Sequence, residues 1–307
     1  MMNRTPVALL AVLLAASCTP AGQLYEPVPV ELGDPVAVDG DTLYRVSGRG
    51  YVLLAGRREA LPDIKQALDV AAVRWRGFFG AEPPPATVLI RDSTTRDLPE
   101  ASVRALGRGP FVGLGPALPE VRPPVAGPAG PAPRPIRRAP AEPVAEAWVR
   151  AFSDSVAGTG RRRGDPGRIP DWLRLGLVEL VGGSGMPEVA ASRLRNDQRL
   201  LPLAGLFSGE QPPPSAPAAE RDDRPRRRTL DDALRDPTER FRLESALVLQ
   251  FLIERGGLTV PRQLLSASAE GRPVGEALAA AGISPADPAA LEQPWREWLN
   301  DVGAPGR

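Results

Sequence analysis

The strongest constraint on the fold of this chain is an apolar helix encoded by residues 169–180. Pro170 suits the first turn of a helix, because its missing N–H costs no hydrogen bond there. Apolar and small residues then recur at the spacing of one helix face, at Trp172, Leu173, Gly176, Leu177 and Leu180. Gly182 and Gly183 follow as a helix stop. This pattern predicts a core helix on which other elements pack.

A second helix is predicted upstream, from Pro143 to about Gly158. Its apolar stripe consists of Val144, Trp148, Ala151, Phe152 and Val156. A loop containing Arg161–Gly164 leads from this helix to the first one. The two helices therefore follow each other directly in the chain.

The sequence of the 169–180 helix resembles that of a helix in gluzincin metallopeptidases of the peptidase MA-like class. In that family a helix reading P-x-W-L-x-E-G-L-A-E lies downstream of the HExxH helix, and its first Glu is the third zinc ligand. The residues that match this pattern are Trp172, Leu173, Gly176, Leu177 and Glu179. Leu175 stands at the ligand position. A later stretch that starts at Ser245 also resembles a family helix, S-x-x-x-x-x-F-L-I-x-x-x-G.

The upstream helix lies where the resemblance places HExxH. In that motif two His four residues apart share one helix face and bind zinc, while the Glu activates water. Glu146 stands at the position of the Glu, and Ala145 and Val149 stand where the two His would be. The chain contains no His at all. The resemblance therefore implies a degenerate, peptidase-like domain without metal or cofactor, and we expect no enzymatic activity.

The remaining carboxylates admit two interpretations. Glu146 and Glu179 could divide acid and base roles if their environments separated their pKa values. The simpler interpretation is that Glu146 pairs with Arg150 at i,i+4, and that Glu179 caps or bridges neighbouring elements. A base that has neither a metal nor a nucleophile beside it has little to act on, so the structural interpretation is favoured.

A serine nucleophile is also a weak candidate. Ser184 lies in a Gly-rich stretch, but Met186 replaces the final Gly of a GxSxG motif. The usual His base is missing, and a Ser–Lys pair would have to use Lys65, the only Lys of the chain. A Gly-rich helix exit explains Ser184 better.

The amino terminus is typical of an exported protein. Arg4 precedes an apolar run from Val7 to Ala16, which is too short to span a bilayer. The run ends in L-A-A-S-C, which resembles a bacterial lipoprotein box with Cys18 as the lipidated first residue of the mature protein. An ordinary secretory signal is the alternative. Cys18 is the only Cys, so no disulfide can form within the chain.

The order of the remaining elements predicts an α+β fold, in which a small N-terminal β-sheet packs on helices and a helical C-terminal half follows. A hairpin is expected from strands 42–46 and 51–55, then a helix over 57–78 and strands at 87–90 and 111–114. Asp236 and Pro237 are typical of a helix start, and this helix should run to about Arg255. Shorter helices are expected within 187–207 and around 260–269, 274–281 and 288–300. The Trp residues of these helices should be core residues.

The predicted organisation is a lipoprotein signal peptide over residues 1–18, a Pro-rich tether over 19–38 and one peptidase MA-like domain over 39–303. Segments 120–142 and 208–228 are rich in Pro and poor in large apolar residues, and we expect them to have little order. Acidic residues interleave with the Arg161–Arg163 and Arg224–Arg228 clusters, which favours solvated loops over lipid contacts.

These features favour a non-catalytic lipoprotein of the cell envelope, anchored outside the cytoplasm on the periplasmic or outer-membrane side. The membrane and a protein or peptide are the expected partners. Export, a net charge of +1 and the lack of aromatic residues among the basic ones disfavour nucleic acid. The alternative is a hydrolase with an unrecognised non-metal site.

Overall fold

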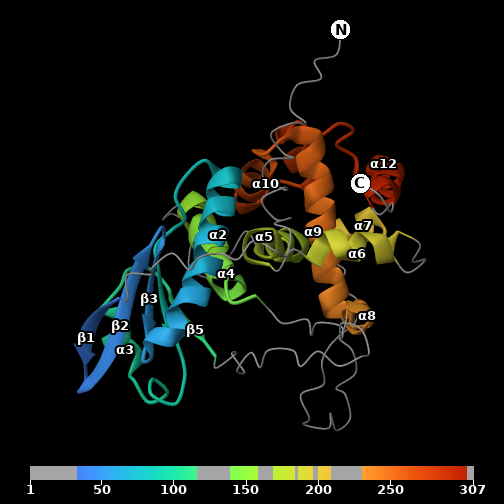
Figure 1. The fold of residues 1–307 in the computed structure, drawn as a ribbon. Helices are drawn as coiled ribbons and strands as arrows, with labels where there is room; N and C mark the ends of the chain where they lie inside the picture. The colour runs from blue at the N-terminus through green and yellow to red at the C-terminus, as the bar shows by residue number, and fades with distance from the viewer. Residues whose placement is uncertain are drawn as a thin grey trace, which may run out of the picture.

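The computed structural model describes residues 33–115, 139–157, 169–183, 186–195, 200–208 and 230–302. Its N-terminal part forms a five-stranded sheet, and the rest of the described chain is helical (Figure 1). The predicted α+β class, with an N-terminal sheet and a helical C-terminal half, is confirmed. The signal segment with Cys18, and residues 116–138 and 209–229, lie outside the described residues.

The strands of the sheet are arranged in the order β1-β2-β3-β4-β5. Their bounds are Asp34–Val38 for β1, Asp41–Gly48 for β2, Tyr51–Ala55 for β3, Ala86–Ile90 for β4 and Phe111–Leu114 for β5. The first three strands pair antiparallel, whereas β4 is parallel to both β3 and β5. The predicted hairpin is therefore present as β2 and β3.

The start of the sheet differs from the prediction. Residues 34–38, which we assigned to the tether, form the edge strand β1. The strand contains Pro35. An edge strand tolerates a Pro, because a residue whose N–H would face away from the sheet has no inter-strand hydrogen bond to lose. The domain thus begins before residue 39.

Helices account for most of the remaining described residues. Their bounds are Leu61–Phe79 for α2, which follows the 3-10 turn η1 at Arg58–Ala60, Glu100–Arg104 for α3, Glu142–Ala157 for α4, Asp171–Gly182 for α5, Met186–Leu194 for α6, Leu203–Ser208 for α7, Leu230–Arg235 for α8, Pro237–Gly256 for α9, Val260–Ala269 for α10, Val274–Ala280 for α11 and Pro288–Val302 for α12. The sequence did not predict α3 and α8. Both are short, with too few turns for a clear period.

The inner face of the sheet packs against α2 and α4 (Figure 1). Leu53 and Val88 on this face are fully buried, as are Trp75 of α2 and Trp148 of α4. The Trp148 indole also donates a hydrogen bond to the Gly50 carbonyl in the β2–β3 turn, at 3.2 Å. This bond and the apolar contacts fix α4 relative to the sheet.

A separate apolar cluster, which we call the outer core, covers part of the opposite face. It consists of Val38, Leu43, Leu54, Leu89, Leu98 and Val103. The last two come from α3 and the segment before it, which cross the sheet on this side. The sheet is therefore covered on both faces, but only partly on the outer one.

Helix α5 lies at the centre of the helical part, in contact with α4, α9 and α2 (Figure 1). Two glycines permit this close packing. A Cβ at Gly176 would lie 2.8 Å from the Ser245 carbonyl oxygen of α9, and one at Gly182 would lie 2.9 Å from the Ala145 Cβ of α4. The predicted core helix is thus in close contact with neighbours on two sides.

Helix α9 has the predicted start. The Asp236 carboxylate accepts a hydrogen bond from the Thr238 N–H at 3.0 Å, and Pro237 is the first helical residue. At its other end, Phe251 contacts Trp295 and Trp298 of α12. Among the residues that the structure describes, none of the helices has the length and apolar composition needed to cross a membrane.

Candidate functional site

The candidate site is the contact between α4 and α5, which carry the five positions singled out by the resemblance. Ala145 and Val149 are fully buried in the main core. Leu175 is partly buried and packs against the same core. Side chains that would be ligands in a metallopeptidase are here apolar groups that hold the helices to the core.

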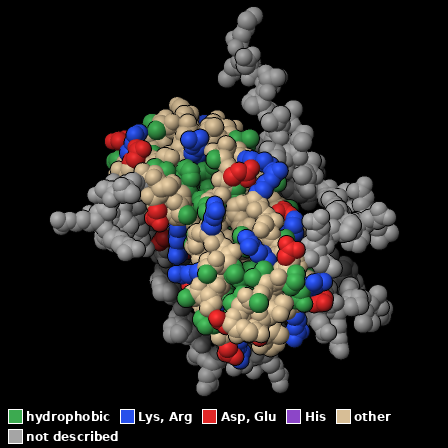
Figure 2. Space-filling view, turned by 90° about the vertical axis from the view of Figure 1, so that its left-hand side faces the viewer, with side chains coloured by type: hydrophobic (Ala, Val, Ile, Leu, Met, Phe, Trp, Pro, Cys, Tyr) green, Lys and Arg blue, Asp and Glu red, His purple; other side chains and the backbone are tan. Residues whose placement is uncertain are grey.

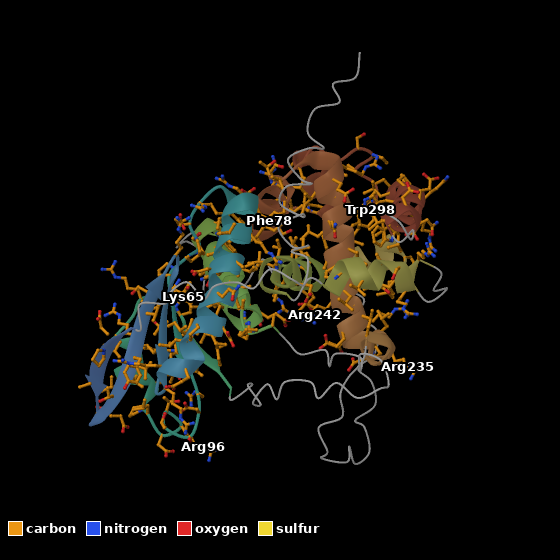
Figure 3. The ribbon with its side chains drawn as sticks, in the orientation of Figure 1. Lys65, Phe78, Arg96, Arg235, Arg242 and Trp298 are labelled. Atoms are coloured by element: carbon orange, nitrogen blue, oxygen red, sulfur yellow. The ribbon has the colours of Figure 1, made fainter. Side chains whose placement is uncertain are left out.

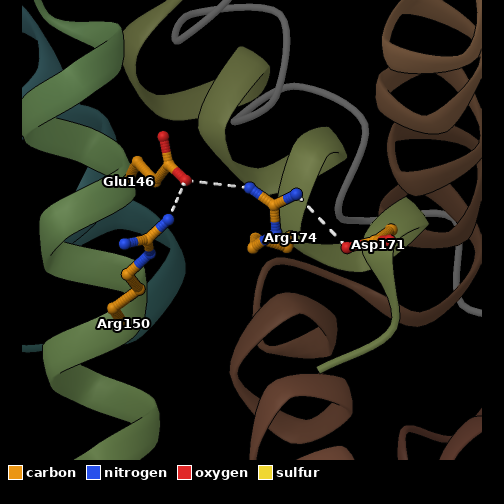
Figure 4. Close-up of polar contacts among 4 residues, drawn as sticks. All are labelled: Glu146, Arg150, Asp171 and Arg174. Atoms are coloured by element: carbon orange, nitrogen blue, oxygen red, sulfur yellow. Dashed lines mark hydrogen bonds and ion pairs between the residues drawn. The ribbon is translucent and has the colours of Figure 1, made fainter. Parts of the chain in front are cut away.

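Glu146 lies at the edge of this contact and is one-third exposed. Its Oε1 accepts hydrogen bonds from Arg150 at 2.6 Å and from Arg174 of α5 at 2.9 Å (Figure 4). Arg174 in turn contacts the Asp171 carboxylate at 3.2 Å. The expected Glu146–Arg150 pair is confirmed, and the Arg174 contact adds a bridge between α4 and α5. A carboxylate that bears two guanidinium groups is held as a structural ion pair.

Glu179 projects in a different direction, toward α9. It is fully buried and lies 3.0 Å from a guanidinium nitrogen of Arg242. The expected bridging role is therefore confirmed. Neither Glu179 oxygen accepts a hydrogen bond from the described residues, so its contact with Arg242 is an ion pair.

Arg242 is the centre of a buried cluster that the sequence did not reveal (Figure 3). Besides Glu179, it contacts Glu142 of α4 at 2.6 Å and Glu239 at 3.0 Å. Three carboxylates thus share one guanidinium, and α4, α5 and α9 meet at this point. We call these four residues the Arg242 cluster.

Burial and the surrounding charges of the Arg242 cluster together change the pKa of Glu179. Burial raises the pKa of Glu179 to about 7, against the attraction of Arg242 and with further repulsion from Glu142 and Glu239. The neighbouring carboxylates raise the pKa of Arg242 despite its own burial. The cluster therefore holds a permanent cation and a carboxyl group that takes up a proton near neutral pH.

The residues at the candidate site do not fit a zinc ion. Zinc in proteins takes His, Cys or carboxylate ligands. Ala145, Val149 and Leu175 supply none of these, and the described part of the chain holds no group of three potential ligands arranged for a metal. The carboxylates of Glu146 and Asp171 contact Arg174, and the three of the Arg242 cluster contact Arg242, so a guanidinium rather than a metal lies against each group.

The other candidate nucleophile and base are not brought together. Lys65 lies on α2, where it pairs with Asp69 at 2.6 Å (Figure 3). Ser184 and the two Arg-rich segments lie outside the described residues. Cys18 lies outside them as well, and its lipidation stays a prediction.

Comparisons of the chain with protein-family models, with curated proteins and with solved structures give no match. The resemblance to gluzincins therefore depends on the residues quoted above. What it implies about function is a proposal.

Proposed function

We propose that this protein is a non-catalytic, envelope-anchored lipoprotein whose peptidase-like domain has lost its zinc ligands and binds a protein or peptide. The observation that carries the proposal is the burial of Ala145 and Val149 in the core, with Glu146 held between two Arg residues. A functional HExxH helix needs its ligands exposed to a metal and its Glu free to activate water. Helix α4 meets neither condition, because Ala145 and Val149 are buried and Glu146 is bound by Arg150 and Arg174.

The first test is made on the wild-type protein. We expect no stoichiometric zinc by metal analysis and no turnover in a general hydrolysis screen of ester, peptide and glycoside substrates. Stoichiometric zinc would contradict the loss of the metal site. Hydrolysis without metal would favour the alternative function, a hydrolase with a non-metal site.

The second test restores the ligands that the resemblance implies. A triple variant, Ala145→His, Val149→His and Leu175→Glu, should gain a zinc site if α4 and α5 keep the geometry of the family. Larger side chains in a packed core cost about 1–3 kcal/mol each, so the metal-free variant should melt below wild type. Added zinc should then raise its Tm by mass action.

The matched control carries the same two His together with Leu175→Gln. Zinc should raise the Tm of this control much less, because the carboxylate ligand of α5 is missing. A triple variant that is indifferent to zinc, or no better than the control, would show that the two helices do not meet as in a gluzincin.

The binding role needs a separate experiment. The surface ion pairs at the α4–α5 edge are the exposed part of the candidate site. Pull-down of a defined partner from membranes should weaken with Arg174→Glu, whereas Arg104→Glu on α3, which also removes a surface pair, serves as the control. Equal recovery with both variants would remove this edge from the proposal.

A further inference from the structure

A cavity of about 520 Å³ opens on the outer face of the sheet, on the side opposite to α2 and α4. Residues of β2, of the β2–β3 turn, of β3, of the start of β4 and of the segment after α3 line it. The lining residues that matter here are Arg45, Ser47, Val52, Leu106, Gly107 and Arg108. Its volume lies within the range of sites that take small molecules, about 300–1,000 Å³.

The floor of the cavity follows from the register of the sheet. Ser47 pairs with Val52 across β2 and β3, and Val52 pairs with Thr87 across β3 and β4. Residues in register lie on the same face of a sheet, so the three form one row. The outer core covers the other end of this face. The short side chains of Ser47 and Val52 leave this end open.

The wall of the cavity is the turn that follows α3. The Thr87 hydroxyl donates a hydrogen bond to the Arg108 carbonyl at 3.2 Å and so ties this turn to β4. A side chain at Gly107 would collide with the side chain of Thr87. The turn is therefore held close to the sheet at one side of the cavity, with Arg108 at its rim.

The charge of the lining is of one sign. Arg45 and Arg108 both line the cavity, and no carboxylate of the described residues lines it. Within the described part of the chain neither of these two side chains forms an ion pair or a hydrogen bond, although Asp34 is the cross-strand neighbour of Arg45. By contrast, Arg104 in the same segment pairs with Glu100.

This local charge is not a property of the whole face. Figure 2 shows the molecule from the sheet side, and there basic and acidic side chains are interspersed with apolar ones. The face as a whole therefore does not carry charge of a single sign. Guanidinium groups bind carboxylate and phosphate in bidentate fashion, whereas Val52 and Leu106 offer an apolar surface beside them.

We propose that this cavity binds a small organic anion, whose phosphate or carboxylate group lies between Arg45 and Arg108 and whose apolar body contacts Val52 and Leu106. The Ser47 hydroxyl is a further donor for the anionic group. None of the lining residues named here comes from α4 or α5. Anion binding in this cavity can therefore be tested separately from the proposed loss of peptidase chemistry.

Isothermal titration of the purified protein with phenyl phosphate tests the proposal. We expect saturable binding of phenyl phosphate, and weaker binding of inorganic phosphate and of phenol, which each carry half of the recognised features. Arg45→Gln and Arg108→Gln should each weaken binding by about tenfold, as expected for loss of a charge-assisted hydrogen bond. Arg49→Gln is the matched control, because Arg49 lies exposed in the neighbouring turn and does not line the cavity.

Absence of saturable binding would overturn the proposal, and so would an equal loss with Arg49→Gln, since that would indicate unspecific attraction. Ser47→Trp gives a second readout, because Ser47 is exposed and a large side chain there can occupy the cavity without replacing a buried residue. Binding that survives this variant would also refute the site.

The same anionic chemistry could come from a free metabolite or from a lipid headgroup. Co-sedimentation with vesicles that contain phosphatidic acid separates these sources. Sedimentation that depends on Arg45 and Arg108 would assign the site to a lipid phosphate. Binding of phenyl phosphate without sedimentation would assign it to a soluble anion.

Discussion

Replacement of Glu179 by Gln should make the protein more stable at alkaline pH. Burial raises the pKa of Glu179 from its ordinary value of 4.5 to about 7, so the folded state binds a proton more tightly than the unfolded state. Between these two pH values the folded protein carries more protons, and stability falls as the pH rises. At about 1.4 kcal/mol per pH unit, up to about 3 kcal/mol present in acid is lost by pH 8.

Gln imitates the protonated carboxyl group in size and charge, so the variant avoids this loss. We expect Glu179→Gln and wild type to have similar free energies of unfolding at pH 5, and the variant to be more stable by about 1–3 kcal/mol at pH 8. Arg242 retains Glu142 and Glu239 as partners in the variant. Urea denaturation followed by Trp fluorescence, from pH 5 to pH 8.5, measures the difference.

The control is Glu146→Gln, which removes a carboxylate from a partly exposed ion pair. Such pairs contribute about 0–1 kcal/mol, so this variant gives the scale of a surface effect. A Glu179→Gln variant that is less stable than wild type at pH 8 would show that attraction to Arg242 outweighs the cost of burial. A difference that does not change with pH would refute the raised pKa.

Two further predictions concern single residues. Arg242→Met should lower the free energy of unfolding by about 3–5 kcal/mol at pH 8, because it leaves the buried carboxylates of Glu142 and Glu179 without their cation. The loss should be smaller at pH 5, where Glu179 is protonated, and an equal loss at both pH values in urea denaturation would contradict the account of the cluster. Cys18→Ala should release the protein from the membrane fraction, because lipidation needs this thiol. A variant that stays as firmly bound as wild type would refute the lipoprotein prediction.

The sequence predicted those parts of the fold that have a local period. The 169–180 helix and the helix that starts at Asp236 were located because apolar residues recur over several turns and the start signals are clear. The strand β1 was missed, since five residues with a Pro show no usable alternation. Short elements pair because of their neighbours in space, and a sequence window does not contain those neighbours.

The candidate site shows the same limit. The Glu146–Arg150 pair could be predicted because its partners lie four residues apart on one helix. The Arg242–Glu142 contact joins residues that are 100 positions apart, and no local pattern connects them. Charged residues surround Arg242 in its helix, at Glu239, Arg240 and Glu244, so nothing in the sequence indicated that Arg242 would be buried.

The central place of α5 has a consequence for how the protein opens. Its contacts with α4 and α9 join segments that are distant in sequence, and Gly176 and Gly182 leave no gap at either contact. The amide groups of α5 can then meet solvent only when the surrounding helices separate together, which is a global event. Hydrogen exchange should therefore be slowest in α5, while the edge strand β1 and the short helix α3 exchange through local opening.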